Sequence, residues 1–239
     1  YDRAALKLDN VEKDALRDKT DSYWRFLLSG ETVTWKDEIA GEINVRTSVV
    51  SDPILVKGNG QFLYTLASVI DDTDFGVTDV VRGIDHLTNT AVQIEIFRNL
   101  SPGLPVFGHH SLIVDNSGEN FSKRSGSLSI KSLKEAGIEA GAIVSKLVSL
   151  GTGDGLDLKN DINELTPDFQ LNKFNTSPVK FEKEVLQTIS RKLIANLSVS
   201  EIFPYLDLIG VPDNIKENFW IMAKDNINSK DDLVEIWKL

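Results

Sequence analysis

A change of hydrophobic pattern near Ser129 constrains the fold of this chain more than any other feature of its sequence. Upstream of that point, short runs rich in β-branched residues are separated by glycine-containing turns, which predicts strands. Downstream, apolar residues recur at helical spacing, and Gly137, Gly151 and Gly210 stand where helices are expected to end. The expected helical segments are 129–136, 139–150, 181–197, 199–209, 213–227 and 229–239. The pattern therefore predicts an α/β region followed by an all-α region.

The upstream region begins with a charge-rich segment and then becomes rich in predicted strands. Residues 8–28 have helical spacing, with a cap at residues 9–12. Residues 44–50 form an expected strand. Residues 54–56 are expected to meet residues 62–64 in a hairpin, because the Lys-Gly-Asn-Gly between them is typical of a tight turn.

A strand, a helix and a second strand then follow one another, which predicts a parallel α/β unit. The first strand covers residues 79–83 and the helix residues 88–99, with Thr90 and Gln93 at capping-box spacing. The second strand is expected at residues 112–114. Ligands in such sheets bind outside the carboxyl ends of strands, so residues 82–86 are where chemistry is expected.

Composition narrows the function classes. The chain contains no cysteine, so it forms no disulfide and no thiolate zinc site. No run of ~18 apolar residues is present, and no membrane span is expected. The net charge of −10 argues against indiscriminate binding to DNA, although RNA binding needs only a local basic face.

The most distinctive stretch is Asn120-Phe121-Ser122-Lys123-Arg124-Ser125-Gly126, which is expected between a strand and a helix. A lysine in such a loop can act as a point charge on a polyphosphate and stabilise a leaving pyrophosphate. Taken alone, the Ser-Lys-Arg triplet favours an exposed loop whose polar residues face water, since such triplets are common.

Other polar residues of the α/β region allow two interpretations each. Arg82 could pair with a carboxylate or lie on the surface, and Tyr64 could reach a polar ligand or pack in the core. Asp71 and Asp72 are expected as helix-cap and loop residues rather than metal ligands, because adjacent carboxylates on extended chain point to opposite faces and rarely share an ion. The adjacent histidines His109 and His110 are expected to be structural rather than metal-binding, because no carboxylate or cysteine cluster accompanies them.

Taken in their order along the chain, these stretches resemble the second half of the catalytic domain of bacterial glutamyl-tRNA synthetases, which are class I enzymes. The similar stretches are Tyr64-Thr65-Leu66-Ala67-Ser68, Ile70-Asp71-Asp72, residues 76–90 and Phe121-Ser122-Lys123-Arg124. The last resembles the Lys-Met-Ser-Lys-Ser signature of class I enzymes in its Lys-Leu-Ser-Lys-Arg form. The resemblance covers essentially the whole chain and is strongest over residues 54–152.

The resemblance implies three parts. Residues 1–60 would belong to the insertion that binds the tRNA acceptor end. Residues 61–128 would form the second half of a Rossmann-like catalytic domain, and residues 129–239 a helical stem-contact domain that leads toward the anticodon-binding region.

The resemblance also implies site residues and substrates. The expected glutamate-binding residues are Tyr64, Ser68 and Arg82, the expected ATP-binding residues are Asp85, His86, Ile113, Ser122, Lys123 and Arg124, and Lys123 is the expected catalytic residue. The implied substrates are L-glutamate, ATP with Mg²⁺, and tRNA(Glu). A cytoplasmic, monomeric enzyme without zinc in this part is implied as well.

The sequence departs from the family pattern at three points. Asn120 stands where the signature usually has its first lysine, and Ser68 replaces a common asparagine. No His-Ile-Gly-His-type motif is present, so the chain is expected to be an internal segment that is inactive alone. A synthetase-derived RNA-binding module without catalysis is the alternative. A truncated paralogue that glutamylates a tRNA base is disfavoured, because such paralogues typically lack a long helical C-terminal region like residues 129–239. An unrelated helical scaffold is disfavoured, because it would leave the ordered motifs unexplained.

Overall fold

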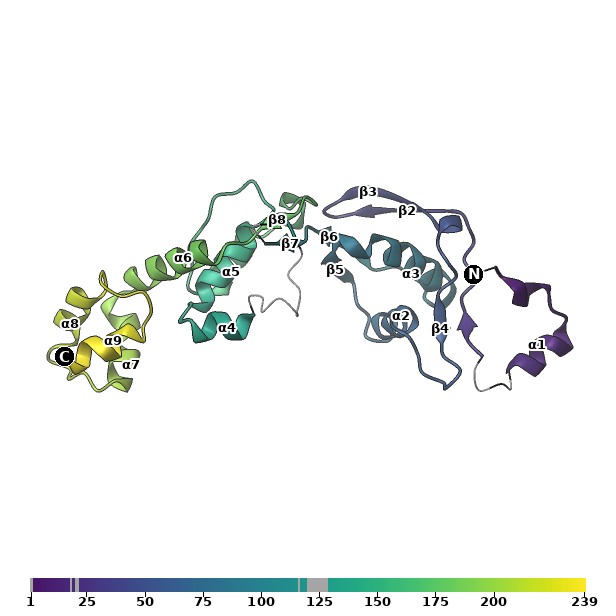
Figure 1. The fold of residues 1–239 in the computed structure, drawn as a ribbon. Coiled ribbons are helices and arrows are strands. Elements are labelled where there is room, and N and C mark those ends of the chain that lie inside the picture. The colour runs from purple at the N-terminus through teal and green to yellow at the C-terminus, as the bar shows by residue number, and fades with distance from the viewer. Residues whose placement is uncertain (1, 18, 20–21, 116, 120–128) are drawn as a thin grey trace. The chain divides into compact units, whose positions relative to one another are not determined.

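The computed structural model describes residues 2–17, 19, 22–115, 117–119 and 129–239. By its internal contacts the chain divides into two compact units, Tyr1–His110 and Ser111–Leu239 (Figure 1). The first unit contains mixed strands and helices and the second is mainly helical, which agrees with the predicted change of structure along the chain. The predicted parts 1–60, 61–128 and 129–239 remain predictions.

The N-terminal helix is shorter than the sequence pattern predicts. A 3-10 helix at Ala4–Lys7 is followed by α1 (Asn10–Arg17), and the chain is extended again at β1 (Trp24–Arg25). The cap at residues 9–12 is confirmed, because the Asp9 and Glu12 side chains each accept the backbone N–H of the other residue. None of the described residues of these two helices is buried. A helix over residues 8–28 would have no core to cover, and β1 instead pairs antiparallel with β4 (Ile54–Val56).

Four strands form the central sheet of the first unit, in the order β3-β2-β6-β5. Their bounds are β2 (Thr32–Asp37), β3 (Gly41–Arg46), β5 (Asp79–Gly83) and β6 (Val106–His110). β2 and β3 are an antiparallel hairpin, whereas β5 and β6 are parallel, and β2 joins β6 through the single pair Asp37 and Phe107. The strand predicted at residues 44–50 ends early, in a 3-10 turn at Thr47–Val49.

The predicted parallel unit is confirmed, but its second strand is β6, which the sequence analysis missed. The helix between the strands is α3 (Leu87–Leu100), preceded by a 3-10 turn at Ile84–His86. The predicted capping box is wrong, because Thr90 and Gln93 lie inside α3 and are buried. The strand predicted at residues 112–114 is β7 (Ile113–Val114), which pairs with β8 (Val179–Lys180) in the second unit.

The predicted hairpin turn after β4 is confirmed, although its second arm is brief. The amide of Lys57 donates to the carbonyl of Gln61 at 2.9 Å, and Val56 and Phe62 form a single bridge. The chain then enters α2 (Tyr64–Asp74). Asp71 and Asp72 therefore lie inside α2, and not at a cap or in a loop as predicted for them.

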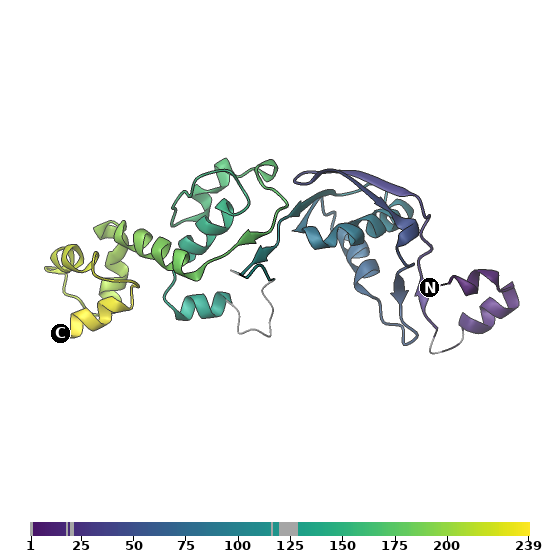
Figure 2. The same ribbon diagram turned by 45° about the horizontal axis from the view of Figure 1, so that its top comes forward.

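The core of the first unit lies around α3, which lies between the sheet and α2 in both ribbon views (Figures 1 and 2). Every residue from Thr90 to Phe97 is buried, because one face of the helix meets the strands and another meets α2. The buried apolar residues of this core are Leu28, Val33, Trp35, Val69, Ala91, Val92, Ile94, Ile96, Phe97 and Phe107.

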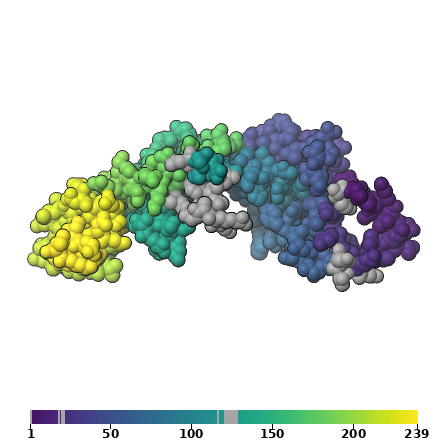
Figure 3. All heavy atoms as spheres, viewed as in Figure 1, coloured from purple at the N-terminus to yellow at the C-terminus, as the bar shows by residue number. Residues whose placement is uncertain are grey.

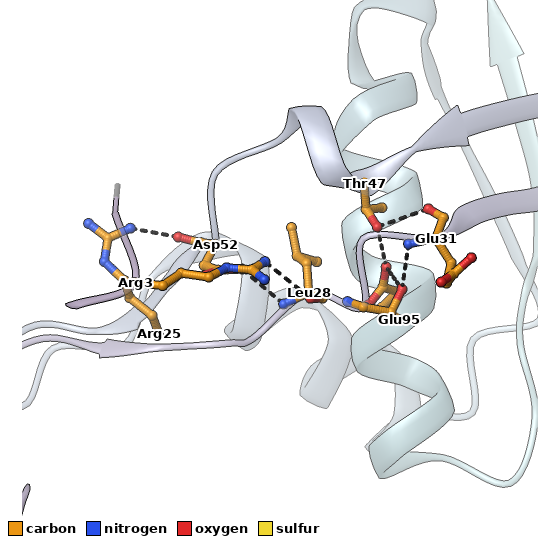
Figure 4. A network of polar contacts seen from close by, with 8 residues as sticks. Arg3, Arg25, Leu28, Glu31, Thr47, Asp52 and Glu95 are labelled. Atoms are coloured by element: carbon orange, nitrogen blue, oxygen red, sulfur yellow. Dashed lines mark hydrogen bonds and ion pairs between the residues drawn. The ribbon is translucent and has the colours of Figure 1, made fainter. Parts of the chain in front are cut away.

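Two buried carboxylates attach the N-terminal segments to this core (Figure 4). Glu95 in α3 accepts hydrogen bonds from the amide and hydroxyl of Ser29 and, at 2.7 Å, from the hydroxyl of Thr47. Asp52 accepts two hydrogen bonds from the Arg3 guanidinium and one from the Leu28 amide. A buried carboxylate is costly unless hydrogen bonds compensate its lost hydration, so these contacts hold the segments in one arrangement.

The second unit contains short helices around two hydrophobic clusters. Its helices are α4 (Ile130–Glu135), α5 (Ala140–Ser149), α6 (Lys183–Ala195), α7 (Val199–Leu208), α8 (Lys216–Ala223) and α9 (Asp232–Lys238), with 3-10 turns at Ile162–Glu164, Thr166–Asp168 and Leu171–Lys173. Gly137, Gly151 and Gly210 have positive φ, which confirms them as helix ends. The last helices, yellow in Figure 3, pack around Ile202, Leu206 and Trp220.

Leu206→Ala is expected to destabilise the C-terminal helices, because Leu206 is fully buried and its truncation leaves a cavity. The expected cost is about 2–5 kcal/mol in the free energy of unfolding, measured by chemical denaturation. Leu208→Ala is the matched control in the same helix, since Leu208 is 80% exposed, and it should change stability by less than about 0.5 kcal/mol. Equal effects of the two variants would contradict the assigned core.

Candidate functional site around Arg82

Arg82 stands near the carboxyl end of β5, directly beside His109 of β6 in the parallel register. Residues paired in this way point to the same face of a sheet. On that face lies α3, which presents Thr90 and Gln93 one turn apart. Arg82, predicted to lie where ligands bind, therefore stands among polar side chains from two other elements.

The guanidinium of Arg82 has three described partners. Its Nη1 donates to the hydroxyl of Tyr64 at 3.0 Å, and its Nη2 donates to Thr90 Oγ1 at 2.5 Å and to Gln93 Oε1 at 2.6 Å. The Arg82 side chain is thus held by the first residue of α2 and by the first half of α3. Charge-assisted hydrogen bonds of this kind are about twice as strong as neutral ones.

Gln93 connects Arg82 to Ser68. The Gln93 amide nitrogen donates to Ser68 Oγ at 2.6 Å, and the Ser68 hydroxyl donates to the carbonyl of Tyr64 at 2.7 Å. The structure therefore brings together Tyr64, Ser68 and Arg82, the three expected glutamate-binding residues. Tyr64 is 53% exposed, so this group opens to solvent on the Tyr64 side.

Behind Arg82, Thr90 contacts a buried histidine–aspartate pair. Thr90 Oγ1 lies 2.7 Å from His109 Nε2, and His109 Nδ1 lies 2.5 Å from Asp37 Oδ2. The Asp37 carboxylate also accepts hydrogen bonds from the indole of Trp35 and from the backbone amides of Ile39, Ala40 and His109. The adjacent histidines at 109–110 were expected to be structural, and the buried contact of His109 with Asp37 fits that expectation.

Burial and hydrogen bonding determine the protonation of the pair. Burial opposes the Asp37 carboxylate, but hydrogen bonds from the Ala40, His109 and Ile39 amides and the His109 ring together hold the pKa of Asp37 below its usual value. Burial lowers the pKa of His109 below 6.5, helped by the charges of Arg82 and His86 and opposed by Asp37. Both shifts favour an ionised Asp37 beside a neutral His109, and an ionised Asp37 can only accept a hydrogen bond from His109 Nδ1.

Two of the six expected ATP-binding residues lie in the first unit, close to Arg82 in the chain. Asp85 and His86 lie in the 3-10 turn after β5, and the His86 ring lies edge-on to the Tyr64 ring with centroids 6.2 Å apart. Ile113 lies in β7 of the second unit. Ser122, Lys123 and Arg124 lie outside the described residues. Asn120, which departs from the signature, lies outside them as well.

Two polar atoms of this site are buried without a hydrogen-bond partner among the described residues, Arg82 Nε and His86 Nδ1. Such atoms are uncommon in folded proteins and are often satisfied by water or a ligand. Both belong to residues that the sequence analysis assigned to substrate binding.

Asp72 contributes a further charge to this region. Burial raises the pKa of Asp72 above its usual value, as does the neighbouring Asp71 charge, while the positive charge of Arg82 acts in the opposite direction. Within the described ranges, no group of three or more His, Cys, Asp or Glu residues could hold a metal ion. Likewise, no helix in the described part of the chain is long and apolar enough to cross a membrane.

Sequence reasoning missed the polar support of Arg82, which consists of Asp37, Thr90, Gln93 and His109. The usable signal was the presence of Thr90 and Gln93 in an otherwise apolar helix, where buried polar side chains need partners. Their spacing is that of one helix face as much as that of a capping box. No local signal connected Asp37 with His109, because they are 72 residues apart.

We expect the free energy of unfolding to fall as the pH is lowered below 6.5, because the unfolded chain protonates His109 while the folded protein resists it. One such proton changes the free energy by up to about 1.4 kcal/mol per pH unit. Denaturant titrations followed by tryptophan fluorescence at several pH values measure the slope. His109→Gln should flatten it and His110→Gln should not; an unchanged slope in His109→Gln would contradict the assignment.

Comparison with known proteins shows where this arrangement belongs. The sequence model of the family described as tRNA synthetases class I (E and Q), catalytic domain, matches residues 1–188. Glutamate–tRNA ligase 2 of Ruegeria sp. (strain TM1040) is 46% identical over an alignment of 240 positions, which covers the whole of this chain and 54% of that protein. Glutamate–tRNA ligase 1 of Paracoccus denitrificans (strain Pd 1222) is 44% identical over the same shares. The chain thus spans about half the length of these curated relatives.

Two solved structures have the same fold. The glutamate tRNA ligase from Elizabethkingia meningosepticum CCUG26117, in complex with its amino acid, has a TM-score of 0.81 at 24% identity and matches 98% of this chain and 52% of that one. The glutamate-tRNA synthetase from Elizabethkingia anophelis has a TM-score of 0.80 at 23% identity, over 98% and 53%. Since the family match over residues 1–188 includes the whole site around Arg82, the chain belongs to the class I tRNA synthetases of the glutamate and glutamine type.

Proposed function

We propose that this chain supplies the second half of the active site of a glutamate–tRNA ligase. That enzyme activates L-glutamate with ATP to glutamyl-adenylate and transfers the glutamyl group to the 3′ end of tRNA(Glu). The observation that carries the proposal is the exposed Tyr64 hydroxyl beside the Arg82 guanidinium at the end of β5, in a chain of this family. The names of its similar relatives support glutamate as the amino acid.

Glutamate binding is assigned to Arg82 and Tyr64, with Ser68 beside them. A carboxylate of the substrate would meet the one described cation of this group, and Tyr64 would offer a neutral hydroxyl at the same place. The Arg82 guanidinium, which Thr90 and Gln93 of α3 hold in place, would favour an anionic ligand over a neutral one of similar size. A neutral ligand would leave the guanidinium without an ionic partner.

ATP binding is assigned to Asp85, His86 and Ile113 at the adenosine and to Ser122, Lys123 and Arg124 at the phosphates. The glutamate carboxylate would attack the α-phosphorus and pyrophosphate would leave, with Mg²⁺ bound mainly by phosphate oxygens. Catalysis would rest on positioning and on stabilisation of the leaving pyrophosphate, for which Lys123 is the proposed catalytic residue. The enzyme would act in the cytoplasm as a monomer.

The remaining parts would bind tRNA. Residues 1–60 are proposed to belong to the acceptor-end insertion, residues 61–128 to the catalytic half-domain, and residues 129–239 to the stem-contact domain. The buried bonds from Ser29 and Thr47 to Glu95 support a firm attachment of the first part to the second.

Arg82→Ala, made in the ligase that contains this chain, is expected to lower kcat/KM for glutamate about 100-fold in ATP–pyrophosphate exchange. Loss of a charge-assisted partner costs about 3 kcal/mol, and each 1.4 kcal/mol is tenfold. Arg98→Ala is the control, because Arg98 is an exposed residue of the same unit at the end of α3. A ligase with unchanged glutamate kinetics in Arg82→Ala would refute the assigned binding site.

The 239 residues alone are expected to show no glutamate-dependent pyrophosphate exchange, because they contain no His-Ile-Gly-His-type motif for the other half of the ATP site. The same assay on the complete gene product provides the positive reference. Exchange by the isolated chain would disprove this point. A complete product that binds tRNA without exchange would instead favour an RNA-binding module descended from a synthetase.

A further inference from the structure

Three of the five N–H groups of the Arg82 guanidinium already donate to described side chains, which leaves few for a ligand. A guanidinium carries five N–H groups, two on each Nη and one on Nε. Both protons of Nη2 are taken, by Thr90 and by Gln93, and one proton of Nη1 points to Tyr64. Nε is buried without a described partner.

This pattern restricts how a ligand carboxylate can be held. Each of the two edges of a guanidinium that can make a two-pronged contact includes Nη2, paired with either Nη1 or Nε. Because Nη2 is occupied, a carboxylate that approaches from the Tyr64 side meets the second proton of Nη1. The Tyr64 hydroxyl accepts its hydrogen bond from Arg82, which leaves the phenolic proton available to donate to the same carboxylate.

The occupation of Nη2 is enforced from the interior. With Asp37 ionised, His109 keeps its proton on Nδ1, so His109 Nε2 must accept. The Thr90 hydroxyl proton has two acceptors within reach, His109 Nε2 at 2.7 Å and the backbone carbonyl of His86 at 3.1 Å, and the shorter contact favours His109. In either case Thr90 Oγ1 accepts from Arg82. Hydrogen bonds thus run in one direction from Arg82 through Thr90 and His109 to Asp37.

The connectivity of an aspartate, a histidine and a hydroxyl is also that of a nucleophilic triad, but this one cannot act as such. Asp37, Thr90 and His109 are all buried, and the hydroxyl of Thr90 is enclosed between His109 and Arg82. A nucleophile must reach its substrate. The arrangement therefore acts on Arg82 alone.

Hydrogen bonds also fix the orientation of the Gln93 side-chain amide. Its amide nitrogen donates to Ser68 Oγ, whose own proton is used toward the Tyr64 carbonyl, so Gln93 Oε1 faces Arg82. Ser68 orients Gln93 by this bond.

We propose that Asp37, His109 and Thr90 are positioning residues that hold Nη2 of Arg82, so that a substrate carboxylate is bound by Nη1 of Arg82 together with the Tyr64 hydroxyl. The inference rests on the proposed function in one respect, since it takes the amino acid substrate as the carboxylate ligand. The histidine tautomer does not depend on that function and can be observed directly by nitrogen-15 NMR. Nδ1 should carry the proton and Nε2 should be bare, and the opposite tautomer would overturn the relay.

The kinetic test uses Thr90→Val in the ligase that contains this chain, because valine keeps the shape and removes the hydroxyl. KM for glutamate should rise about tenfold in pyrophosphate exchange, which corresponds to about 1.4 kcal/mol, while KM for ATP stays unchanged. Thr90→Ser should restore the wild-type KM, and Thr88→Val, at an exposed position of the same helix, is the matched control.

A double-mutant cycle separates positioning from general damage. If Thr90 acts through Arg82, adding Thr90→Val to Arg82→Ala should cause no further loss in kcat/KM for glutamate. Fully additive losses, or an equal rise in KM for ATP, would overturn the proposal. A wild-type ligase without glutamate-dependent exchange would refute the proposed function instead, and the NMR tautomer would still decide the relay.

Discussion

The Asp37 carboxylate is the contact on which the site depends. It lies in the interior, where a charge is costly unless donors replace the water it has lost, and it meets five: one indole, one imidazole and three backbone amides. These donors come from the β2–β3 hairpin and from β6. One side chain therefore closes the turn of the hairpin, joins it to the parallel strands and determines which nitrogen of His109 carries the proton. Through His109 and Thr90 its effect reaches Arg82, the proposed contact to the substrate.

The same principle acts at Glu95, farther along α3, and at Asp52, which precedes β4. Glu95 and Asp52 are buried carboxylates whose donors belong to segments distant in the sequence. Apolar packing around α3 supplies most of the stabilisation, but it is not directional. The carboxylates add direction, because each requires particular donors at particular distances. Helix α3 is thus the common partner of the N-terminal segments, of the sheet and of α2, and it carries both Thr90 and Gln93.

Local patterns sufficed for part of the fold and site. The strand at Asp79–Gly83, the helix after it and the helix ends follow from the spacing of apolar residues and from the position of glycines, which adopt positive φ readily. The ordered motifs pointed to Tyr64, Ser68 and Arg82, which the structure brings together. β6 was missed because Val106–His110 contains a glycine and two histidines and lacks an alternating apolar pattern. The helix predicted at residues 8–28 failed because local spacing does not show that the chain has no core there to cover. The buried relay was beyond prediction, since its partners meet only after the strands have paired. The roles of Asp85, His86, Ile113, Ser122, Lys123 and Arg124 stay predictions.

The single-pair junction between β2 and β6 has a consequence for strand register. In an ordinary pair of strands, many backbone hydrogen bonds resist a slip by one residue. Between β2 and β6, Asp37 and Phe107 are the only described register pair. Along β2, Val33, Trp35 and Asp37 face inward and Thr32, Thr34 and Lys36 outward. A slip by one residue would present Lys36 or Glu38 to the buried imidazole and would turn Val33 and Trp35 out to solvent. The charge at position 37 therefore specifies the alignment of the hairpin, a task that backbone pairing performs in most sheets.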